Sequence, residues 1–371
     1  MNRLPQFIFF LVVVLGIYYG MHYYVFRRIT HGLELSAVAS ARLRMIFLAG
    51  AFLFFAGELM SRYQFSAVIK PVVSAGGIWL GALSIAVTVF IFADIARLVF
   101  HGAAARHFIT ISSLWLIFGA CAVSLVNGFR KPVVTEVSIA APGLAANANQ
   151  LTIVQLSDLH LQFGSPAKWL DSVVEETNRL KPDVIVITGD LIDADICKDA
   201  RFCAALRRLK AREGVYAITG NHEFYTGVRV FENIARAAGI TVLRNRKVVI
   251  RDSIELGGID DPQFEDASKS LAETWGGEPS KNFRILLSHR PSTFDAARRF
   301  GVNLQLSGHL HAGQIPPVDI IVKLFFKYPA GLYRKGNDFI YTSRGTGTWG
   351  PPMRLFSPSE IVRLKIISTP A

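Results

Sequence analysis

The sequence predicts an α/β chain in which four transmembrane helices precede a soluble domain built on parallel strands. Three observations support this prediction. Four long apolar runs lie within the first 131 of the 371 residues. From Leu151 onward, short β-branched runs recur, and each is followed at once by polar residues that can bind a metal. Between the first two of these runs, residues 168–180 carry apolar side chains at helical spacing, and Lys181-Pro182 ends the helix.

Residues 1–131 have the composition of a transmembrane region. The chain is 51% hydrophobic and only 18% charged, with a mean hydropathy of +0.34, and the imbalance is greatest here. A helix needs roughly 20 apolar residues to cross a bilayer. The first run has no small-residue cleavage site and is followed by Arg27-Arg28, which favours a retained span over a signal peptide. The predicted spans are residues 7–25, 45–60, 71–93 and 108–126.

The net charge of +12 and the pI near 9.8 would suit a nucleic-acid-binding protein. However, residues 1–131 hold 11 lysines and arginines against 3 acidic residues, so most of the excess lies beside the apolar runs. Basic residues in that position are typical of membrane flanks. We therefore expect a membrane as partner and no nucleic acid.

Charge and cysteine content bear on the side of the membrane that the soluble domain faces. The first and third connections between the predicted spans contain six arginines. The N-terminus, the second connection and the segment after the fourth span contain five basic residues, so the positive-inside rule does not decide the orientation. Cys197 and Cys203 lie in a predicted helix and read most simply as reduced thiols, although a bridge between them stays open. Reduced thiols favour a cytosolic face.

Residues 132–150 are predicted to be a linker that contains a short strand candidate, and the soluble domain is predicted to cover residues 151–371. Strands buried on both faces read as continuous apolar runs, and ligands of such sheets gather at the carboxyl ends of the strands. Strands are predicted at residues 151–156, 184–188, 215–219, 284–287 and 302–306, and further helices at 202–209 and 231–238.

Each predicted strand ends in a motif that contains Asp, Asn or His. In order, these motifs are Asp158-Leu159-His160, Asp190-Leu191-Ile192-Asp193, Asn221-His222-Glu223, Ser288-His289 and His309-Leu310-His311. Extended backbone projects residues i and i+2 to the same side, so we expect the two rings of the last motif to face one point. Neutral imidazole is the commonest protein ligand for zinc, iron and manganese. Any one histidine could be an ordinary core residue. Five groups of polar residues at strand ends, however, would not stabilise a hydrophobic core.

The five ordered motifs resemble those of the calcineurin-like metallophosphoesterase family, over residues 151–365. Residues 328–333, 343–352 and 357–361 resemble the membrane-anchored branch of that family, which includes a cell-wall-associated bacterial phosphoesterase and a hydrolase of UDP-2,3-diacylglucosamine in lipid A synthesis. The resemblance implies a four-layer α/β/β/α domain. Ala312 departs from the glycine of the family's His-Gly-Gly-Gln version, which puts the conformation of that loop in question.

The resemblance also implies a pair of divalent ions, manganese, iron or zinc. A carboxylate can bridge two cations about 3.5–4 Å apart, and mixed oxygen and imidazole ligands suit these three metals better than magnesium or calcium. By this resemblance, one ion would be held by Asp158, His160 and His311, the other by Asn221, His289 and His309, and Asp190 would bridge both.

Four further residues receive roles from the same resemblance or from their position beside the motifs. His222, oriented by Asp193, would stabilise the transition state or protonate the leaving oxygen. Arg290 and Arg344 are candidates for binding phosphate through their guanidinium groups, with surface ion pairs as the alternative interpretation.

The leading hypothesis is a dinuclear metal-dependent phosphohydrolase at the membrane surface that cleaves a lipid-linked phosphate or pyrophosphate ester, with UDP-2,3-diacylglucosamine as the specific substrate. That substrate would place the protein in a bacterial inner membrane with its catalytic domain in the cytoplasm. A periplasmic domain would instead point to wall polymers or lipid carriers. The alternatives are a phosphodiesterase or phosphomonoesterase acting on cell-envelope or nucleotide substrates, and a non-catalytic membrane sensor. The sequence leaves the oligomeric state open.

One apolar stretch, residues 315–328, is too short and too interrupted by proline to span a bilayer. We expect it to lie near the membrane or to line a pocket for acyl chains. The alternative is an ordinary buried strand and helical turn.

Overall fold

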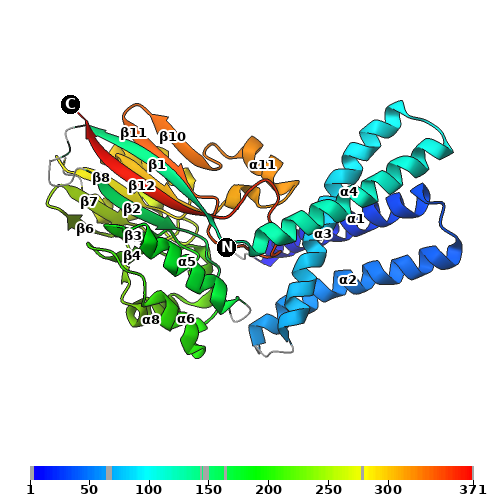
Figure 1. Ribbon diagram of the computed structural model, residues 1–371, viewed down its shortest axis with the longest axis horizontal. Coiled ribbons are helices and arrows are strands. Elements are labelled where there is room, and N and C mark those ends of the chain that lie inside the picture. The colour runs from blue at the N-terminus through cyan, green and yellow to red at the C-terminus, as the bar shows by residue number, and fades with distance from the viewer. Residues whose placement is uncertain are drawn as a thin grey trace. The chain divides into compact units, whose positions relative to one another are not determined.

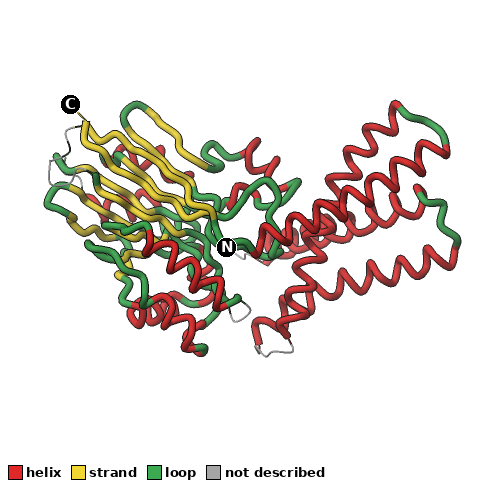
Figure 2. Tube along the Cα trace, in the orientation of Figure 1, coloured by secondary structure: helices red, strands yellow, loops and turns green. Residues whose placement is uncertain are grey.

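The computed structural model describes residues 4–63, 69–142, 144, 150–162, 165–276 and 280–369. The chain divides into two compact units. The helical unit consists of Met1–Asn127, Ile315–Val318 and Gly350–Leu355, and the α/β unit consists of Gly128–Gln314, Asp319–Trp349 and Phe356–Ala371. Figure 2 shows the long helices of the first in red and the strands of the second in yellow.

The helical unit is built on four long helices, and each of the four predicted spans lies inside one of them. These helices are α1 (Leu4–Gly32), α2 (Ala37–Tyr63), α3 (Ile69–Val99) and α4 (Ala103–Phe129). Within the described residues, three segments are long and apolar enough to cross a membrane, namely Ala37–Gly57, Pro71–Val99 and Ala103–Phe129. The unit packs around α3, where Leu83, Ala86 and Phe90 are buried against side chains of neighbouring helices.

Two short segments from the C-terminal half of the chain complete the helical unit. Ile315, Met353 and Leu355 form an apolar cluster with Ile85 of α3. The hydroxyl of Ser84, also on α3, donates to the carbonyl oxygen of Pro316 at 2.7 Å. The chain therefore returns twice to the helical unit after the α/β unit has begun.

The α/β unit contains two six-stranded sheets (Figure 1). The first has the order β1-β12-β2-β3-β4-β5, with β1 (Val133–Pro142), β2 (Leu151–Leu156), β3 (Val184–Ile187), β4 (Val215–Ala217), β5 (Thr241–Val242) and β12 (Glu360–Thr369). The second has the order β10-β11-β9-β8-β7-β6, with β6 (Arg246–Ile250), β7 (Ile254–Gly258), β8 (Phe283–Leu287), β9 (Leu304–Ser307), β10 (Gly331–Lys335) and β11 (Asp338–Thr342).

Helices cover the outer face of each sheet. On β3, Ile185 and Ile187 face a cluster that includes residues of α5 (Ala167–Arg179), α6 (Ala200–Leu206) and α8 (Val228–Ala238). The alternate residues Val184 and Val186 face the core between the two sheets, as period-two geometry requires. A third cluster joins α9 (Ala267–Trp275) and α10 (Phe294–Ala297) to the second sheet. The layers are helix, sheet, sheet and helix, which confirms the predicted fold class.

The predicted linker is not a simple connection. Residues 132–150 contribute β1, which pairs in parallel with β12 along its whole length, from Val133 opposite Glu360 to Pro142 opposite Thr369. The α/β unit accordingly begins at Gly128 rather than at residue 151. A local pattern could not indicate this pairing, because the two partner strands are separated by most of the domain.

The two cysteines of the α/β unit are bonded to each other, so the interpretation as reduced thiols is wrong. Cys197 and Cys203 form a disulfide with their Cα atoms 5.6 Å apart, inside the range that a disulfide requires. The prediction assumed one helix through both residues. Instead, a turn at Asp199 separates the short 3₁₀ helix Ile196–Lys198 from α6, and this turn brings the two cysteines together.

Candidate metal centre

The central strands of both sheets run parallel, so their carboxyl ends bring the polar motifs together. In the first sheet β2, β3 and β4 are parallel neighbours, and in the second β8 and β9 are. Asp158 and His160 follow β2, and the remaining motifs follow the other four strands. The polar motifs that follow the strands of both sheets therefore meet at one edge of the pair of sheets.

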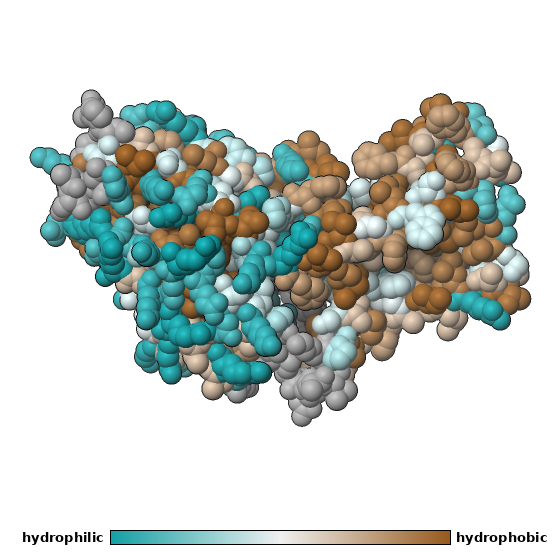
Figure 3. Space-filling model, viewed as in Figure 1, coloured by the Kyte–Doolittle hydropathy of each residue, from teal (hydrophilic) through white to brown (hydrophobic). Residues whose placement is uncertain are grey.

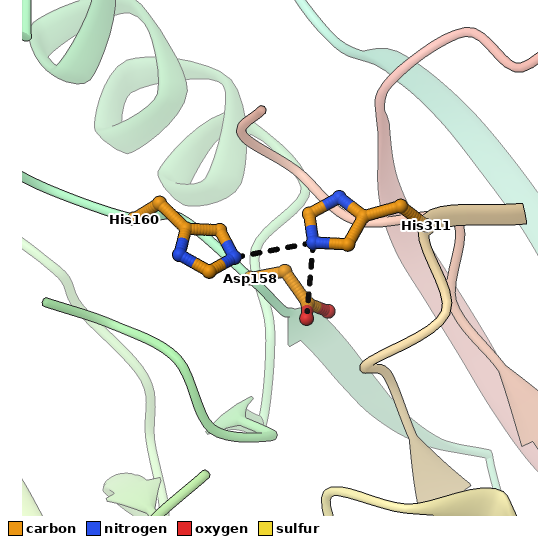
Figure 4. Close-up of side chains that lie close together, drawn as sticks. All are labelled: Asp158, His160 and His311. Atoms are coloured by element: carbon orange, nitrogen blue, oxygen red, sulfur yellow. Dashed lines mark hydrogen bonds and ion pairs between the residues drawn. The ribbon is translucent and has the colours of Figure 1, made fainter. Parts of the chain in front are cut away.

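One group of possible ligands, cluster one, consists of Asp158, His160 and His311 (Figure 4). The Nε2 atoms of the two imidazoles are 3.1 Å apart, and Nε2 of His311 is 3.5 Å from Oδ1 of Asp158. All three side chains are buried. Two ring nitrogens and a carboxylate oxygen thus point at a common centre, the arrangement that a cation needs.

A second group, cluster two, consists of Asp190, His289 and His309. Nε2 of His289 is 3.2 Å from Oδ2 of Asp190 and 3.2 Å from Nδ1 of His309. Burial lowers the pKa of His309 to about 3, helped by the charges of His289 and Arg290. His309 is consequently neutral at physiological pH, which is the form of imidazole that binds metals.

Asp190 lies between the two clusters. Its Oδ2 is 3.2 Å from Nε2 of His289 in cluster two and 3.8 Å from Nε2 of His160 in cluster one. Its other oxygen, Oδ1, accepts the backbone N–H of His222 at 2.9 Å. The hydrogen bond fixes the carboxylate and leaves one oxygen directed at both sets of ring nitrogens.

The residues fit a bound cation on two independent grounds. The Oδ1 atom of Asn221 is buried and has no hydrogen-bond partner among the described residues, although a buried carbonyl oxygen is normally satisfied. The second ground is the electrostatic field of the carboxylates. Burial lowers the pKa of His160, but the charges of Asp193, Asp190 and Asp158 outweigh it and raise that pKa to about 9. The site thus attracts positive charge.

The outer nitrogens of the imidazoles are held by hydrogen bonds. Nδ1 of His160 lies 2.9 Å from Oδ1 of Asp193, and Nδ1 of His289 lies 2.9 Å from the carbonyl oxygen of Thr188. A carbonyl oxygen only accepts, so Nδ1 of His289 donates to Thr188, and Nε2 is the ring nitrogen that faces the cluster. Such outer partners orient the ring of a metal ligand.

Asp193 also orients His222, whose Nδ1 lies 2.8 Å from the same Oδ1 atom. Burial opposes ionisation of Asp193, but the charges and hydrogen bonds of His160 and His222 outweigh it and lower its pKa to about 2. Asp193 therefore stays ionised and links a ring of cluster one to a histidine outside both clusters.

Five of the seven predicted metal ligands have a left-handed backbone, which non-glycine residues adopt at a cost of about 1–3 kcal/mol each. The φ angles are 53° at Asp158, 48° at His160, 51° at Asp190, 73° at His309 and 49° at His311. The expectation that extended backbone turns both rings of the last motif to one point is therefore wrong. The chain twists between them, so His311 enters cluster one and His309 enters cluster two.

Gly308 lets the loop after β9 approach the loop after β2. A Cβ on Gly308 would lie 2.0 Å from Oγ of Ser157 and 2.2 Å from Oδ2 of Asp158. The same close approach allows the backbone N–H of His309 to donate to Oδ1 of Asp158 at 2.9 Å. Glycine is therefore required between the β9 strand and its two histidines.

The sequence analysis predicted no role for Glu223. In the structure this residue holds the loops that carry Asp190 and Asn221. Its buried carboxylate accepts the backbone N–H groups of Asp190, Leu191, Ile192 and Gly220 at 2.7–3.1 Å. The one sequence signal was an acidic residue in the first turn of a helix, α7 (Asn221–Thr226), which follows directly after a strand.

The two arginines proposed as phosphate ligands differ in position. Arg290 donates from Nε to Asp261 at 3.0 Å, and its charge acts on His309, so it lies beside cluster two. Arg344 is bound to buried Glu360, with Nη2 to Oε2 at 2.6 Å, and also donates to Thr135 on β1. Arg344 thus holds β12 and β1 to the loop after β11, and we do not retain it as a substrate ligand.

Exposed aromatic side chains surround His222, a feature that the sequence pattern did not reveal. The rings of Tyr225 and Trp349 both meet the His222 ring edge-on, with centroids 5.5 and 6.2 Å away, and they are 61% and 55% exposed. Phe264 contacts Tyr225 and is itself exposed. The amide of Gln314 pairs with the backbone N–H and carbonyl of Trp349, both at 3.0 Å. We call Tyr225, Phe264 and Trp349 the aromatic rim.

Comparison with known proteins agrees with this geometry. Residues 151–313 match the family described as calcineurin-like phosphoesterase. An uncharacterized metallophosphoesterase of Helicobacter pylori is 32% identical over 267 residues, which cover 71% of each chain. A transmembrane protein with metallophosphoesterase domain from Bos taurus is 36% identical over 67% of this chain and 60% of its own length, and one from Danio rerio is 33% identical over 69% and 62%. The chain is therefore a membrane-associated member of the calcineurin-like phosphoesterase family.

Proposed function

We propose that the chain is a two-metal phosphohydrolase that acts on a lipid-linked phosphate or pyrophosphate ester at a membrane surface. The observation that carries the two-metal proposal is the position of Asp190, whose Oδ2 faces ring nitrogens of both clusters. A single oxygen placed between two sets of ligands is what a bridging carboxylate requires.

In this proposal Asp158, His160 and His311 hold one ion, and Asn221, His289 and His309 hold the other, with Asp190 shared. Two bound ions supply positive charge that stabilises the phosphoryl oxygens and activates water for attack. The protein contributes the fixed geometry. The rings of His160 and His289 are aimed by the hydrogen bonds that they donate to Asp193 and to the carbonyl oxygen of Thr188. Glu223 holds the loops in place, so little reorganisation accompanies the reaction.

His222 is the proposed general acid. Asp193 holds its Nδ1 at 2.8 Å and orients the ring, so that Nε2 can donate a proton to the oxygen of the leaving group. Asp193, with its lowered pKa, remains ionised while His222 gives up that proton. Arg290 is the proposed phosphate ligand beside cluster two, because its charge already acts on His309.

The aromatic rim supports an organic and largely apolar leaving group. Tyr225 and Trp349 expose apolar surface next to the proposed acid, where the leaving group of a bound ester would lie. Such surface costs free energy unless it binds something. The relatives come from bacteria and vertebrates, so a broad class of lipid-linked phosphate esters accounts for them better than a single bacterial lipid. UDP-2,3-diacylglucosamine is one member of this class to be tested.

The disulfide changes the expected compartment. One of the two arguments for a cytosolic face, besides the nucleotide-linked substrate, was that the thiols are reduced, but Cys197 and Cys203 are bonded. Disulfides persist mainly in oxidising compartments, which favours an α/β unit outside the cytoplasm and substrates such as lipid carriers or wall polymers. A reporter fused after Ala371 tests this orientation directly.

The function is tested with the full-length protein purified in detergent and supplied with Mn²⁺. Phosphate and nucleotide release is measured with UDP-2,3-diacylglucosamine, a polyprenyl pyrophosphate and bis-p-nitrophenyl phosphate, for the native chain and for Asp190→Ala and His222→Ala. Turnover of a lipid ester that both substitutions abolish supports the proposal. Turnover of only the chromogenic diester retains the two-metal chemistry and rejects the lipid substrate. Two bound metals without any turnover would favour a sensor.

A further inference from the structure

Helix α11 (Val318–Phe325) presents its apolar face outward. Its largest side chains, Leu324 and Phe325, are 73% and 78% exposed. Val318, Ile320 and Ile321 are also exposed. At 100° per residue these five positions occupy one continuous arc of the helix, of roughly 160°. The alternative interpretation, an ordinary buried strand and helical turn, therefore does not hold for α11.

The opposite side of α11 attaches the helix to the protein. Asp319 and Val322 are buried, and Lys323 lies near Asp319, with Nζ 3.8 Å from Oδ2. An amphipathic helix normally buries its apolar face, so the pattern of α11 is reversed. Figure 3 shows the hydrophobic colouring of the surface over this helix. A patch of this kind on a described surface marks an interaction site.

The environment of the helix identifies the partner as lipid. Among the described residues, the chain carries three segments that are long and apolar enough to cross a membrane, and the α/β unit is covalently joined to them. The residues just before α11, Ile315–Val318, belong to the helical unit, and Pro316 accepts a hydrogen bond from Ser84 inside the candidate span Pro71–Val99. The helix thus begins where the chain leaves a membrane-associated segment.

The charges beside the apolar arc fit the same partner. Lys323 lies at the edge of the arc, and Lys327 follows one residue after exposed Phe326. Lysine can extend along apolar surface and place its ammonium group at the level of lipid headgroups. Helices with bulky apolar residues on one face and lysine at the border lie flat in the interfacial region of a membrane.

We propose that α11 lies in the headgroup region of the membrane to which the chain belongs, with Leu324 and Phe325 inserted among the acyl chains. The helix orients the α/β unit at the lipid surface. This inference stands independently of the proposed phosphohydrolase activity, because it concerns contact with lipid and not turnover.

The test uses the full-length protein with Cys121 replaced by serine, since Cys197 and Cys203 are bonded and do not react with a thiol label. A fluorescent label is placed at position 325 by Phe325→Cys, with Leu324→Cys as a second position. Lys323→Cys is the matched control on the polar side of α11, and Val249→Cys on exposed β6 is the control distant in sequence. Each protein is reconstituted into vesicles of phosphatidylcholine and phosphatidylglycerol, and quenching by nitroxide-labelled lipid and by aqueous iodide is measured.

We expect the labels at 325 and 324 to be quenched several-fold more by the lipid nitroxide than the label at 249, and several-fold less by iodide. The label at 323 should remain accessible to iodide. If the labels at 325 and 324 respond to iodide as the label at 249 does, the face is open to water and the proposal is overturned. Shielding from both quenchers would mean that protein, such as a second copy of the chain, covers the face, and this outcome also overturns it.

Discussion

The metal centre and α11 depart from the usual distribution of side chains in opposite directions. In the centre, acids, imidazoles and an amide are buried at the edge of two sheets. In α11, leucine, isoleucine and phenylalanine are exposed on a helix whose acid is buried. Both arrangements cost folding free energy. Buried polar groups lose their hydration, and exposed apolar groups do not gain the favourable free energy of burial.

The difference lies in what offsets the cost. In the proposed function a cation would compensate the buried carboxylates and the oxygen of Asn221, which has no hydrogen-bond partner among the described residues, and lipid would compensate the apolar arc of α11. Substitutions in the centre should therefore alter chemistry and metal content, whereas substitutions in α11 should alter only the relation to lipid. The predictions below test this distinction.

The largest effect is expected from Asp190→Asn. Asparagine keeps the size of the side chain and an acceptor for the N–H of His222, but it removes the charge that faces both clusters. Turnover of bis-p-nitrophenyl phosphate should fall by about 10³-fold, the upper end of the 10²–10³-fold cost of losing one charge-stabilising group, because this carboxylate faces both clusters. Metal content, measured by atomic emission, should fall with it. Asp295→Asn, at an exposed ion pair with Lys327, is the control, and native activity of Asp190→Asn would contradict the bridging role.

A smaller loss with metal retained is expected from His222→Ala. His222 belongs to neither cluster one nor cluster two. Its Nδ1 contacts their outer partner Asp193, and its ring meets the ring of His160 edge-on with centroids 4.6 Å apart. Removal of a general acid costs typically about 10²–10⁴-fold in turnover. With bis-p-nitrophenyl phosphate we expect the lower end, about 10²-fold, because p-nitrophenolate needs little protonation, and the metal content should stay at the native level. The loss should shrink for an ester whose leaving group needs no proton, such as p-nitrophenolate compared with an alkoxide. An equal loss for both leaving groups would exclude the acid role.

The strands could be predicted from the sequence because their signal is local. A run such as Val184–Ile187 is apolar throughout, as a strand buried on both faces must be, and the polar motif that follows within a few residues indicates the edge of the site. That logic led to the prediction of Asp158, Asp190, Asn221, His289 and His309 as site residues without any contact information. It could not supply the left-handed turn between His309 and His311, since the turn depends on packing of the β9 loop against Asp158.

Other features were not predictable because they depend on distant partners. Glu223 acts by accepting four backbone N–H groups. Every residue except proline supplies such a group, so the donors cannot be recognised from the sequence. Trp349 contacts His222 only in the folded protein, because the two residues are 127 positions apart in the sequence. For α11, the pattern of apolar residues shows that the helix has an apolar face but not whether that face points inward. The same pattern describes a core helix and an interfacial one.

The α11 side of the comparison is tested by the double substitution Leu324→Ser and Phe325→Ser. Both side chains are exposed, so the thermal midpoint of the α/β unit should stay unchanged or rise slightly. Turnover of a lipid ester in vesicles should fall several-fold because the domain is less well oriented at the surface, whereas turnover of the soluble diester should not change. Val322→Ser, at a buried position of the same helix, is the matched control and should lower the midpoint. Equal losses on both substrates would show that α11 supports the fold.

The smallest effect concerns Ala312, which lies next to His311 with φ 49° and ψ 28°. A left-handed conformation costs a residue with a Cβ about 1–2 kcal/mol, and glycine avoids this cost but loses more entropy on folding. Ala312→Gly should therefore stabilise the loop by a net amount of about 0.5–1 kcal/mol, seen as a rise of a few degrees in the thermal midpoint of the metal-loaded protein. Gly313→Ala, at φ 79°, is the reciprocal control and should lower the midpoint. If Ala312→Gly lowers the midpoint as well, the packing of the Ala312 methyl group must stabilise the loop by more than its backbone strain costs. Burial would then determine the stability of this loop, as it does in the hydrophobic core and not in α11.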